Sequence, residues 1–184
     1  MKKLVLATAF VVACLIGANA QSGKNQIGVG ADIGIPTGDF GDGFSVGIGG
    51  YVKGFLGVGT AGQVTLTTGY SSFSMKDEFE QLLGVDKASA TVVPILLGYR
   101  HNFSGFYAEP QVGYNIFGAR VKSGGVTASD SEGAFAWAVG FGYVINNFDI
   151  GARYESMHKD GESNAFVGFR VGYNFSLGGA SDKK

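Results

Sequence analysis

Apolar and small or polar residues alternate along most of this chain, and this period of two constrains the fold more than any other feature. In a β-strand, side chains at i, i+2 and i+4 lie on one face of the sheet, so the alternation predicts strands with one apolar face. The pattern is clearest near the end of the chain. There the apolar face reads Ala165, Val167, Phe169, Val171, Tyr173, Phe175 and Leu177, and Arg170 and Asn174 are among the residues between.

Seven further segments carry the same alternation. Three are as regular as the last one, at 27–35, 135–143 and 148–155. Four are less regular, at 44–54, 62–70, 91–100 and 106–116, and Phe44 falls on the apolar face of the first of these. The sequence therefore predicts an all-β chain of eight antiparallel strands, with boundaries uncertain by a few residues.

The expected connections alternate in length. Long ones are expected at 36–43, 71–88, 119–132 and 158–163, and short ones at 55–61, 101–105 and 145–147. Long outer loops and short periplasmic turns are typical of up-and-down barrels in the outer membrane. The loop at 71–88 is predicted to hold one short helix through Phe79, Leu82 and Leu83.

The first residues predict export. Lys2 and Lys3 precede an apolar run that ends in Ala18, Asn19 and Ala20, which is the arrangement of a cleavable signal peptide. We expect a signal peptide at 1–20 with cleavage between Ala20 and Gln21, a barrel at 21–177 and a short polar tail at 178–184.

The only cysteine lies inside the predicted signal peptide. A lipoprotein box ending at Cys14 is the alternative, but Leu15 and Ile16 continue the apolar run past the cysteine. Removal of the segment leaves no cysteine, which excludes disulfide frameworks, thiol catalysis and cysteine-based zinc sites.

The composition of the two faces decides which of them points inward. A soluble lipocalin-like barrel also alternates, but with the apolar face inside, its water-facing surface here would be mostly glycine, of which the chain has 32 residues. No position assigned to an apolar face is charged, as a lipid-facing surface requires, because a charge at mid-depth costs about 2 to 4 kcal/mol. We therefore predict a transmembrane barrel whose apolar face contacts lipid and whose small or polar residues face inward.

The charges assigned to the inner face are balanced in sign. Charges enclosed in a narrow barrel must be paired and hydrogen-bonded, because unpaired burial costs several kcal/mol. An eight-stranded barrel is only wide enough for side chains to fill, so we predict a plugged interior crossed by a charge network. Its members are Asp32, Lys53, Arg100, Glu109, Asp149, Arg153, Glu155 and Arg170. Pro94 and Pro110 fit a closed sheet badly, and we expect them near membrane boundaries or bulges.

Four strand motifs carry a family resemblance: TVVPILLGYRHNF, FYAEPQVGYNIFG, FDIGARYE and FVGFRVGYNF. With them the chain resembles the small OmpA/OmpX-type outer-membrane β-barrel proteins of Gram-negative bacteria. The resemblance implies insertion by the barrel-assembly machinery, for which Tyr173 and Phe175 would supply the aromatic end of the last strand. The tail LGGASDKK departs from the usual terminal Phe, and no peptidoglycan-binding domain is expected to follow.

Few residues offer chemistry. The stretches GVGADIG and GIGGYVKG lack the strand, turn and helix context of a nucleotide loop, so no cofactor is expected. His101 and His158 fall at different connections, which argues against a shared metal site. A lipid-modifying enzyme would have to use His158 with Glu155, Ser156, Glu162 and Ser163, but Ser156 is expected on the lipid side and Glu155 inside. The acidic residues Asp77, Glu78, Glu80 and Asp86 lack calcium-loop spacing and predict a solvated face.

The sequence favours a non-enzymatic protein of the cell outer membrane with a structural or loop-presenting, adhesive role. Its expected partners are membrane lipid, the assembly machinery and an unidentified extracellular partner at the outer loops, and no nucleic acid. The alternatives are a narrow porin-like channel for small solutes, a lipid-modifying enzyme and a soluble lipocalin-like barrel.

Overall fold

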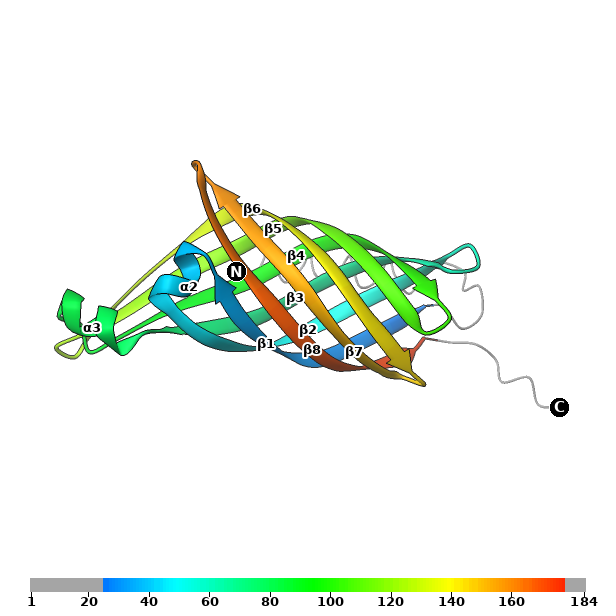
Figure 1. Cartoon of the computed structure of the whole chain (residues 1–184), viewed down its shortest axis with the longest axis horizontal. Helices are drawn as coiled ribbons and strands as arrows, with labels where there is room; N and C mark the ends of the chain where they lie inside the picture. Colours follow the sequence, from blue (N-terminus) through cyan, green and yellow to red (C-terminus); the bar gives the residue numbers. More distant parts are fainter. Residues whose placement is uncertain (1–24, 178–184) are drawn as a thin grey trace.

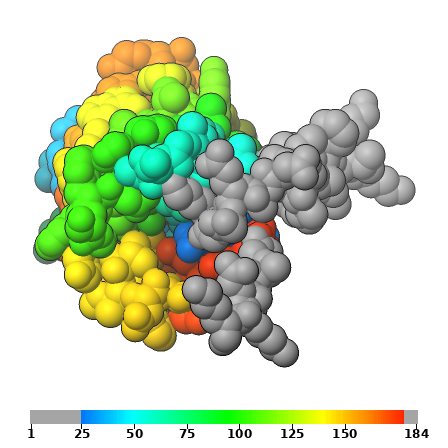
Figure 2. Space-filling view, turned by 90° about the vertical axis from the view of Figure 1, so that its right-hand side faces the viewer, coloured from blue at the N-terminus to red at the C-terminus, as the bar shows by residue number. Residues whose placement is uncertain are grey.

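The computed structural model describes residues 25–177, and in them eight antiparallel strands close into a barrel, as the alternation predicts (Figure 1). Each strand pairs with the next along the chain, and β1 closes the ring against β8. Figure 2 shows this closure from one end, with blue β1 beside red β8. The strands are β1 (Gln26–Thr37), β2 (Phe44–Val58), β3 (Gly62–Met75), β4 (Lys87–Phe103), β5 (Phe106–Ser123), β6 (Val126–Ile145), β7 (Phe148–Lys159) and β8 (Glu162–Ser176).

The two ends of the barrel differ. At one end, which we call the turn end, β1 begins, β8 ends, and strands are joined by the tight connections 59–61, 104–105 and 146–147. At the other, the helix end, the connections include α2 (Asp39–Gly43) and α3 (Asp77–Leu83) (Figure 1). The predicted helix is thus present as α3, although its apolar residues Phe79, Leu82 and Leu83 are exposed. The sequence did not predict α2.

Two long loops expected at the helix end are in fact mostly strand. The segment 119–132 lies within β5 and β6, which pair from Ser123↔Val126 onward and turn only at Gly124 and Gly125. Likewise β7 and β8 meet at the turn Asp160–Gly161 instead of a loop at 158–163. The prediction was wrong because these strands continue past their last apolar residues, and the polar sequence there was interpreted as a loop.

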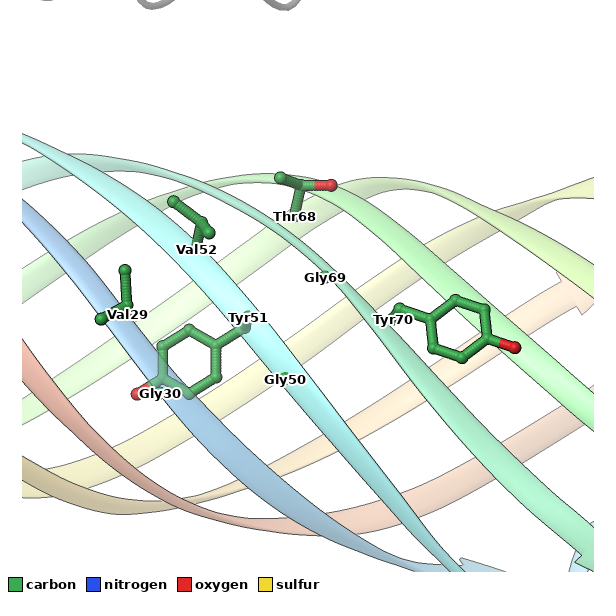
Figure 3. Close-up of a pocket in the computed structure, with 8 residues that line it drawn as sticks. All are labelled: Val29, Gly30, Gly50, Tyr51, Val52, Thr68, Gly69 and Tyr70. Carbon is green, nitrogen blue, oxygen red and sulfur yellow. The ribbon is translucent and has the colours of Figure 1, made fainter.

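The outer surface is apolar over the middle of the barrel. Ile48 and Phe141 are 71% and 61% exposed, and most outward-facing residues in the middle of the strands are aliphatic or aromatic. Gly50 interrupts this surface and lies at the base of a shallow depression bordered by Val29, Val52, Thr68 and Tyr70 (Figure 3). Among residues 25–177, no helix is long and apolar enough to span a membrane.

Two local irregularities differ from expectation. The β2–β3 register shifts between Phe44 and Gly47, which turns Phe44 inward to pack beside Phe40, and not outward as its sequence position predicted.

Pro94 and Pro110 do not lie at this bulge. The β3–β4 ladder is interrupted at Pro94 and the β4–β5 ladder at Pro110, while each proline keeps its pairing with the strand on its other side. Each proline therefore interrupts one ladder over two positions, while the strand itself continues.

The predicted signal peptide, Cys14, the Ala20–Gln21 cleavage site and the tail 178–184 lie outside the described residues.

Candidate functional site: the barrel interior

All eight charged residues that the alternation assigned to the inner face are buried inside the barrel. They come from six strands: Asp32 on β1, Lys53 on β2, Arg100 on β4, Glu109 on β5, Asp149, Arg153 and Glu155 on β7, and Arg170 on β8. Each lies at an inward position of its strand, two residues from other inward side chains. The structure divides them into two groups of four.

The group nearer the turn end, which we call the ion-pair network, consists of Lys53, Arg100, Glu109 and Asp149. Lys53 Nζ donates to both carboxylate oxygens of Glu109, at 2.8 and 2.9 Å. Arg100 donates to Glu109 through Nε at 3.0 Å and Nη2 at 2.9 Å, and to Asp149 Oδ2 through Nη1 at 2.6 Å. The chain of pairs thus connects β2, β5, β4 and β7 across the lumen. Ionised donors and acceptors form the stronger class of hydrogen bond.

Neutral groups complete this network. Thr65 Oγ1 donates to Glu109 at 2.7 Å, and the Tyr107 hydroxyl donates to Asp149 Oδ1 at 2.7 Å. The Tyr107 ring also lies under the Arg100 guanidinium, 3.5 Å from ring centroid to Cζ, in cation–π geometry. Every carboxylate oxygen in the network therefore accepts at least one hydrogen bond.

Glycines on the inner face make room for these rings. A Cβ at Gly142 or Gly151 would collide with the Tyr107 hydroxyl, and one at Gly30 would lie 2.7 Å from the Tyr51 ring. The glycine-rich inner face thus accommodates large side chains that reach across the narrow lumen. Around Tyr51 and Tyr107, the glycines do not leave empty space.

The second group, the central cluster, consists of Asp32, Arg153, Glu155 and Arg170. Arg153 Nη1 lies 2.8 Å from Glu155 Oε2, and Asp32 Oδ2 lies 3.8 Å from Arg153 Nη2 and 3.9 Å from Arg170 Nη2. These charges are less completely hydrogen-bonded than those of the ion-pair network. Among the described residues, Arg153 Nε and Nη1, Glu155 Oε2, and Arg170 Nε and Nη2 have no hydrogen-bond partner.

Aromatic rings fill the interior nearer the helix end. We call Phe40, Phe44, Phe73, Phe117 and Phe166 the phenylalanine cluster. Phe40 enters the lumen from α2, with its ring centroid 5.0 to 6.0 Å from those of Phe44, Phe73 and Phe117. Phe73 in turn lies 5.4 Å from Phe166. Buried Ala90, Val92, Leu96, Ala134, Ala136, Ala138 and Met157 pack around the rings.

The expectation of only small or polar residues inside is therefore wrong: phenylalanines fill the half nearer the helix end, and Phe55 is buried beside Arg100 nearer the turn end. Phe40 and Phe73 were missed because both fall in segments expected to be loops, and Phe44 because a bulge reverses its face. Phe117 follows the outward residue Ile116, so strict alternation beyond the predicted strand end would have placed it inside.

Each mouth of the barrel holds a recess. The one at the turn end has a volume of about 290 Å³ and is bounded inward by Arg100, with Gln26, Gln63 and Asn102 at its walls. The recess at the helix end, of about 310 Å³, is bounded by Phe117 and Met157. The two recesses share no lining residue.

Of the residues considered for catalysis, Ser156, His158 and Ser163 lie on the outer wall and Glu162 lies at the rim of the helix end. Ser156 Oγ lies 2.9 Å from His158 Nε2 and 3.3 Å from Ser163 Oγ, and Trp137 Nε1 donates to the same His158 nitrogen at 3.1 Å. Glu155 faces the opposite side, toward Arg153, so no carboxylate orients the histidine from within this set. His101 lies apart, against Tyr99 and Phe103.

Two of the four acidic residues singled out at the helix end have structural partners. Glu80 accepts a hydrogen bond from the Ala88 amide and Asp86 from the Gly124 amide, each through one carboxylate oxygen. Within residues 25–177, no three His, Cys, Asp or Glu side chains are grouped as metal ligands.

Comparison with known proteins places this geometry among outer-membrane barrels. Residues 6–175 match the model of the family described as the outer membrane protein beta-barrel domain. No curated protein sequence matches the chain significantly.

Solved structures share the fold at low sequence identity. Ail, the attachment invasion locus protein of Yersinia pestis, is 17% identical, with 83% of this chain and 99% of that chain covered and a TM-score of 0.61. Neisserial surface protein A is 11% identical, covering 83% and 97% of the two chains, with a TM-score of 0.55. The N-terminal barrel domain of Pseudomonas aeruginosa OprF is 15% identical, covering 84% and 100%, with a TM-score of 0.53.

Proposed function

The chain belongs to the outer membrane protein beta-barrel domain family and is an outer-membrane protein, and from this premise we propose that it is a non-enzymatic, plugged barrel that presents its helix end outside the cell. The observation that carries the proposal is the filling of the lumen. Ion pairs connect opposite strands at one level and phenylalanine rings meet at another. A solute crossing the barrel would have to displace both.

A plugged barrel acts through its surface, because its interior offers no path. The helix end supports this role. Its hairpins β3–β4 and β5–β6 extend past the apolar belt and carry α3 and the turn at Gly124 and Gly125. Segments displayed on a rigid scaffold are where binding functions are commonly found.

The absence of an oriented triad among Ser156, His158 and Ser163 supports a non-enzymatic role. These side chains face the lipid side, while the carboxylate of Glu155 is inside the barrel. Acyl transfer would need a base oriented by a third group. Lipid A extracted from cells with and without the protein should therefore have the same acylation pattern, and a difference that depends on Ser156 would contradict the proposal.

Solute flux tests the plug. Proteoliposomes that contain the refolded protein should swell in a small sugar no faster than empty liposomes, while a porin in the same lipid makes them swell quickly. Swelling at a rate proportional to the amount of folded protein would contradict a plugged interior.

Cysteine labelling tests which end faces outside. Thr127 lies at the helix end and Thr60 at the turn end, and both are exposed. In intact cells, a membrane-impermeant maleimide should label T127C and leave T60C unlabelled until the outer membrane is opened. The reverse pattern would overturn the proposed orientation, and equal labelling of both after lysis is the control.

A further inference from the structure

The outer wall of the barrel changes character abruptly toward the helix end of β3, β4 and β5. Outward residues of the apolar belt end with Tyr70 on β3, Val93 on β4 and Ile116 on β5. Beyond them, every outward position on these three strands is polar, basic or glycine. These positions are Ser72 and Ser74 on β3, Thr91, Ser89 and Lys87 on β4, and Gly118, Arg120 and Lys122 on β5.

Three cations gather on this wall. Lys87 is paired directly with Lys122 across β4 and β5, and Arg120 lies opposite Ser89 in the next row on the same face. Like charges directly opposite each other on a sheet are destabilising. Among the described residues, none of the three forms an ion pair or a side-chain hydrogen bond. The arrangement therefore holds three positive charges that form no ion pair with the rest of the described chain.

Hydroxyl groups and a recess accompany these cations. Ser74, Ser89 and Arg120 lie in one row across β3, β4 and β5, and together with Ser72, Lys87 and Lys122 they line a recess of about 240 Å³. The adjoining outward positions of β6 are Thr127, Ser129 and Ser131, so β6 adds hydroxyl groups and no carboxylate to this part of the wall. Lysine, arginine and serine together are suited to binding the oxygens of a phosphate group.

The position of these basic residues along the barrel axis, next to the apolar belt, indicates which ligand they bind. Tyr70, which faces outward at the edge of the belt, and Tyr114, one outward position inside that edge on β5, are of the residue type that concentrates at membrane–water interfaces. Arg120 lies two outward positions beyond that edge on β5, and Lys87 and Lys122 lie three beyond it, on the side where lipid headgroups lie when acyl chains contact the belt. The surface is thus continuous with the lipid-facing surface.

We propose that Lys87, Arg120 and Lys122, which we call the basic wall, bind the phosphate groups of lipid in the outer leaflet. The lipid would place its acyl chains against the belt below and its phosphates between the opposed lysines. Binding would relieve the repulsion between Lys87 and Lys122 and hold the barrel at a fixed depth. The inference rests on the proposed orientation of the helix end, which the cysteine labelling tests separately.

Lipid titration of the folded protein in neutral detergent micelles tests this proposal, with native mass spectrometry as the readout. The probes are phosphorylated lipid A and the same lipid after phosphatase treatment. The variant is K87Q/K122Q. The control is K76Q/K159Q, which removes two positive charges at the same end whose ammonium groups already have partners in the protein, Lys76 at the Gly41 carbonyl and Lys159 at Glu132.

The wild type should bind the phosphorylated lipid more tightly than the dephosphorylated form, and K87Q/K122Q should bind the phosphorylated lipid about 25-fold more weakly than the wild type does. The factor follows from a gain of roughly fivefold for each basic residue near an anionic lipid surface. The control variant should lose less than about twofold, since long-range effects of net charge are screened by salt.

Heat-modifiable gel migration confirms that each variant is folded. Because K87Q/K122Q removes a like-charge pair, it should unfold in neutral detergent no more readily than the wild type.

Equal binding of the two lipids by the wild type would overturn the proposal. Equal losses of lipid affinity in the K87Q/K122Q and K76Q/K159Q variants would also overturn it. The same holds if the site binds a soluble sulfated saccharide and binds the two lipids equally well.

Discussion

The two halves of the barrel interior are filled by opposite chemistry. Near the turn end, Glu109 accepts five hydrogen bonds or ion-pair contacts from Lys53, Arg100 and Thr65, and each partner is fixed by direction and charge. Near the helix end, Phe40, Phe73 and their neighbours fill volume without directional contacts. The first half tolerates no missing partner, because a charge left alone in a buried site is costly, whereas the second half tolerates whatever preserves volume.

The largest effect is expected from removing the centre of the polar half. Glu109→Ala should lower the free energy of unfolding by about 3 to 5 kcal/mol, because it leaves Lys53 and the guanidinium of Arg100 short of a counter-charge. Urea unfolding in micelles, followed by Trp137 fluorescence, measures the change. The variant should still be exported. A loss under 1 kcal/mol would mean that the pairs of the ion-pair network contribute little.

A slightly smaller effect is expected in the apolar half. Phe73→Ala should cost about 3 kcal/mol, since it removes a fully buried ring that contacts Phe40 and Phe166. Phe73→Leu, which keeps most of the volume, should cost under about 1.5 kcal/mol. Equal losses from both substitutions, in the same urea experiment, would show that the ring is needed for more than its volume.

A pair of matched double variants compares the two charged groups directly. Lys53→Met with Glu109→Gln should cost about 2 to 3 kcal/mol, because well-aligned hydrogen bonds to charged groups are lost. Arg153→Met with Glu155→Gln should cost under about 1 kcal/mol, because that pair lacks hydrogen-bond alignment and the new amide still accepts from Asn115.

Both double variants remove one charge of each sign and leave one opposite pair behind. Their difference in midpoint urea concentration therefore isolates how well the pairs are hydrogen-bonded. Equal midpoints would remove the distinction between the ion-pair network and the central cluster.

The smallest effect is expected for an ion pair outside the lumen. Lys159 and Glu132 pair at the rim of the helix end, where both side chains are more than a third exposed. Lys159→Ala should leave the midpoint urea concentration almost unchanged, because exposed pairs are screened by water and salt. An effect as large as that of Glu109→Ala would show that burial is not what separates the pairs.

The sequence predicted the architecture well for a physical reason. Lipid requires an apolar residue at nearly every outward position, so residues such as Val171 and Phe169 identify strand, face and membrane together. The same alternation placed the eight inner charges inside, since a charge such as Arg100 or Glu109 is excluded from the lipid face.

The partners of the buried charges and the aromatic residues that fill the lumen were harder to predict. Which cation meets Glu109 depends on register around a closed sheet, and Lys53 is 56 residues away in sequence. Phe40 enters the lumen from a five-residue helix that is too short to show a helical period in the sequence. The bulge at Phe44 turns that side chain inward, and no sequence pattern indicates the bulge. Beyond the apolar belt, strands such as the end of β5 lose the pattern because their outward side chains no longer contact acyl chains.

Single-channel recording tests the central claim most directly, because it asks whether the two interior regions together close the lumen. The refolded wild-type protein, inserted in a planar bilayer and checked by heat-modifiable migration, should give no steady openings over a range of voltage and salt. Steady single-channel openings of uniform conductance in the wild-type protein would contradict the account.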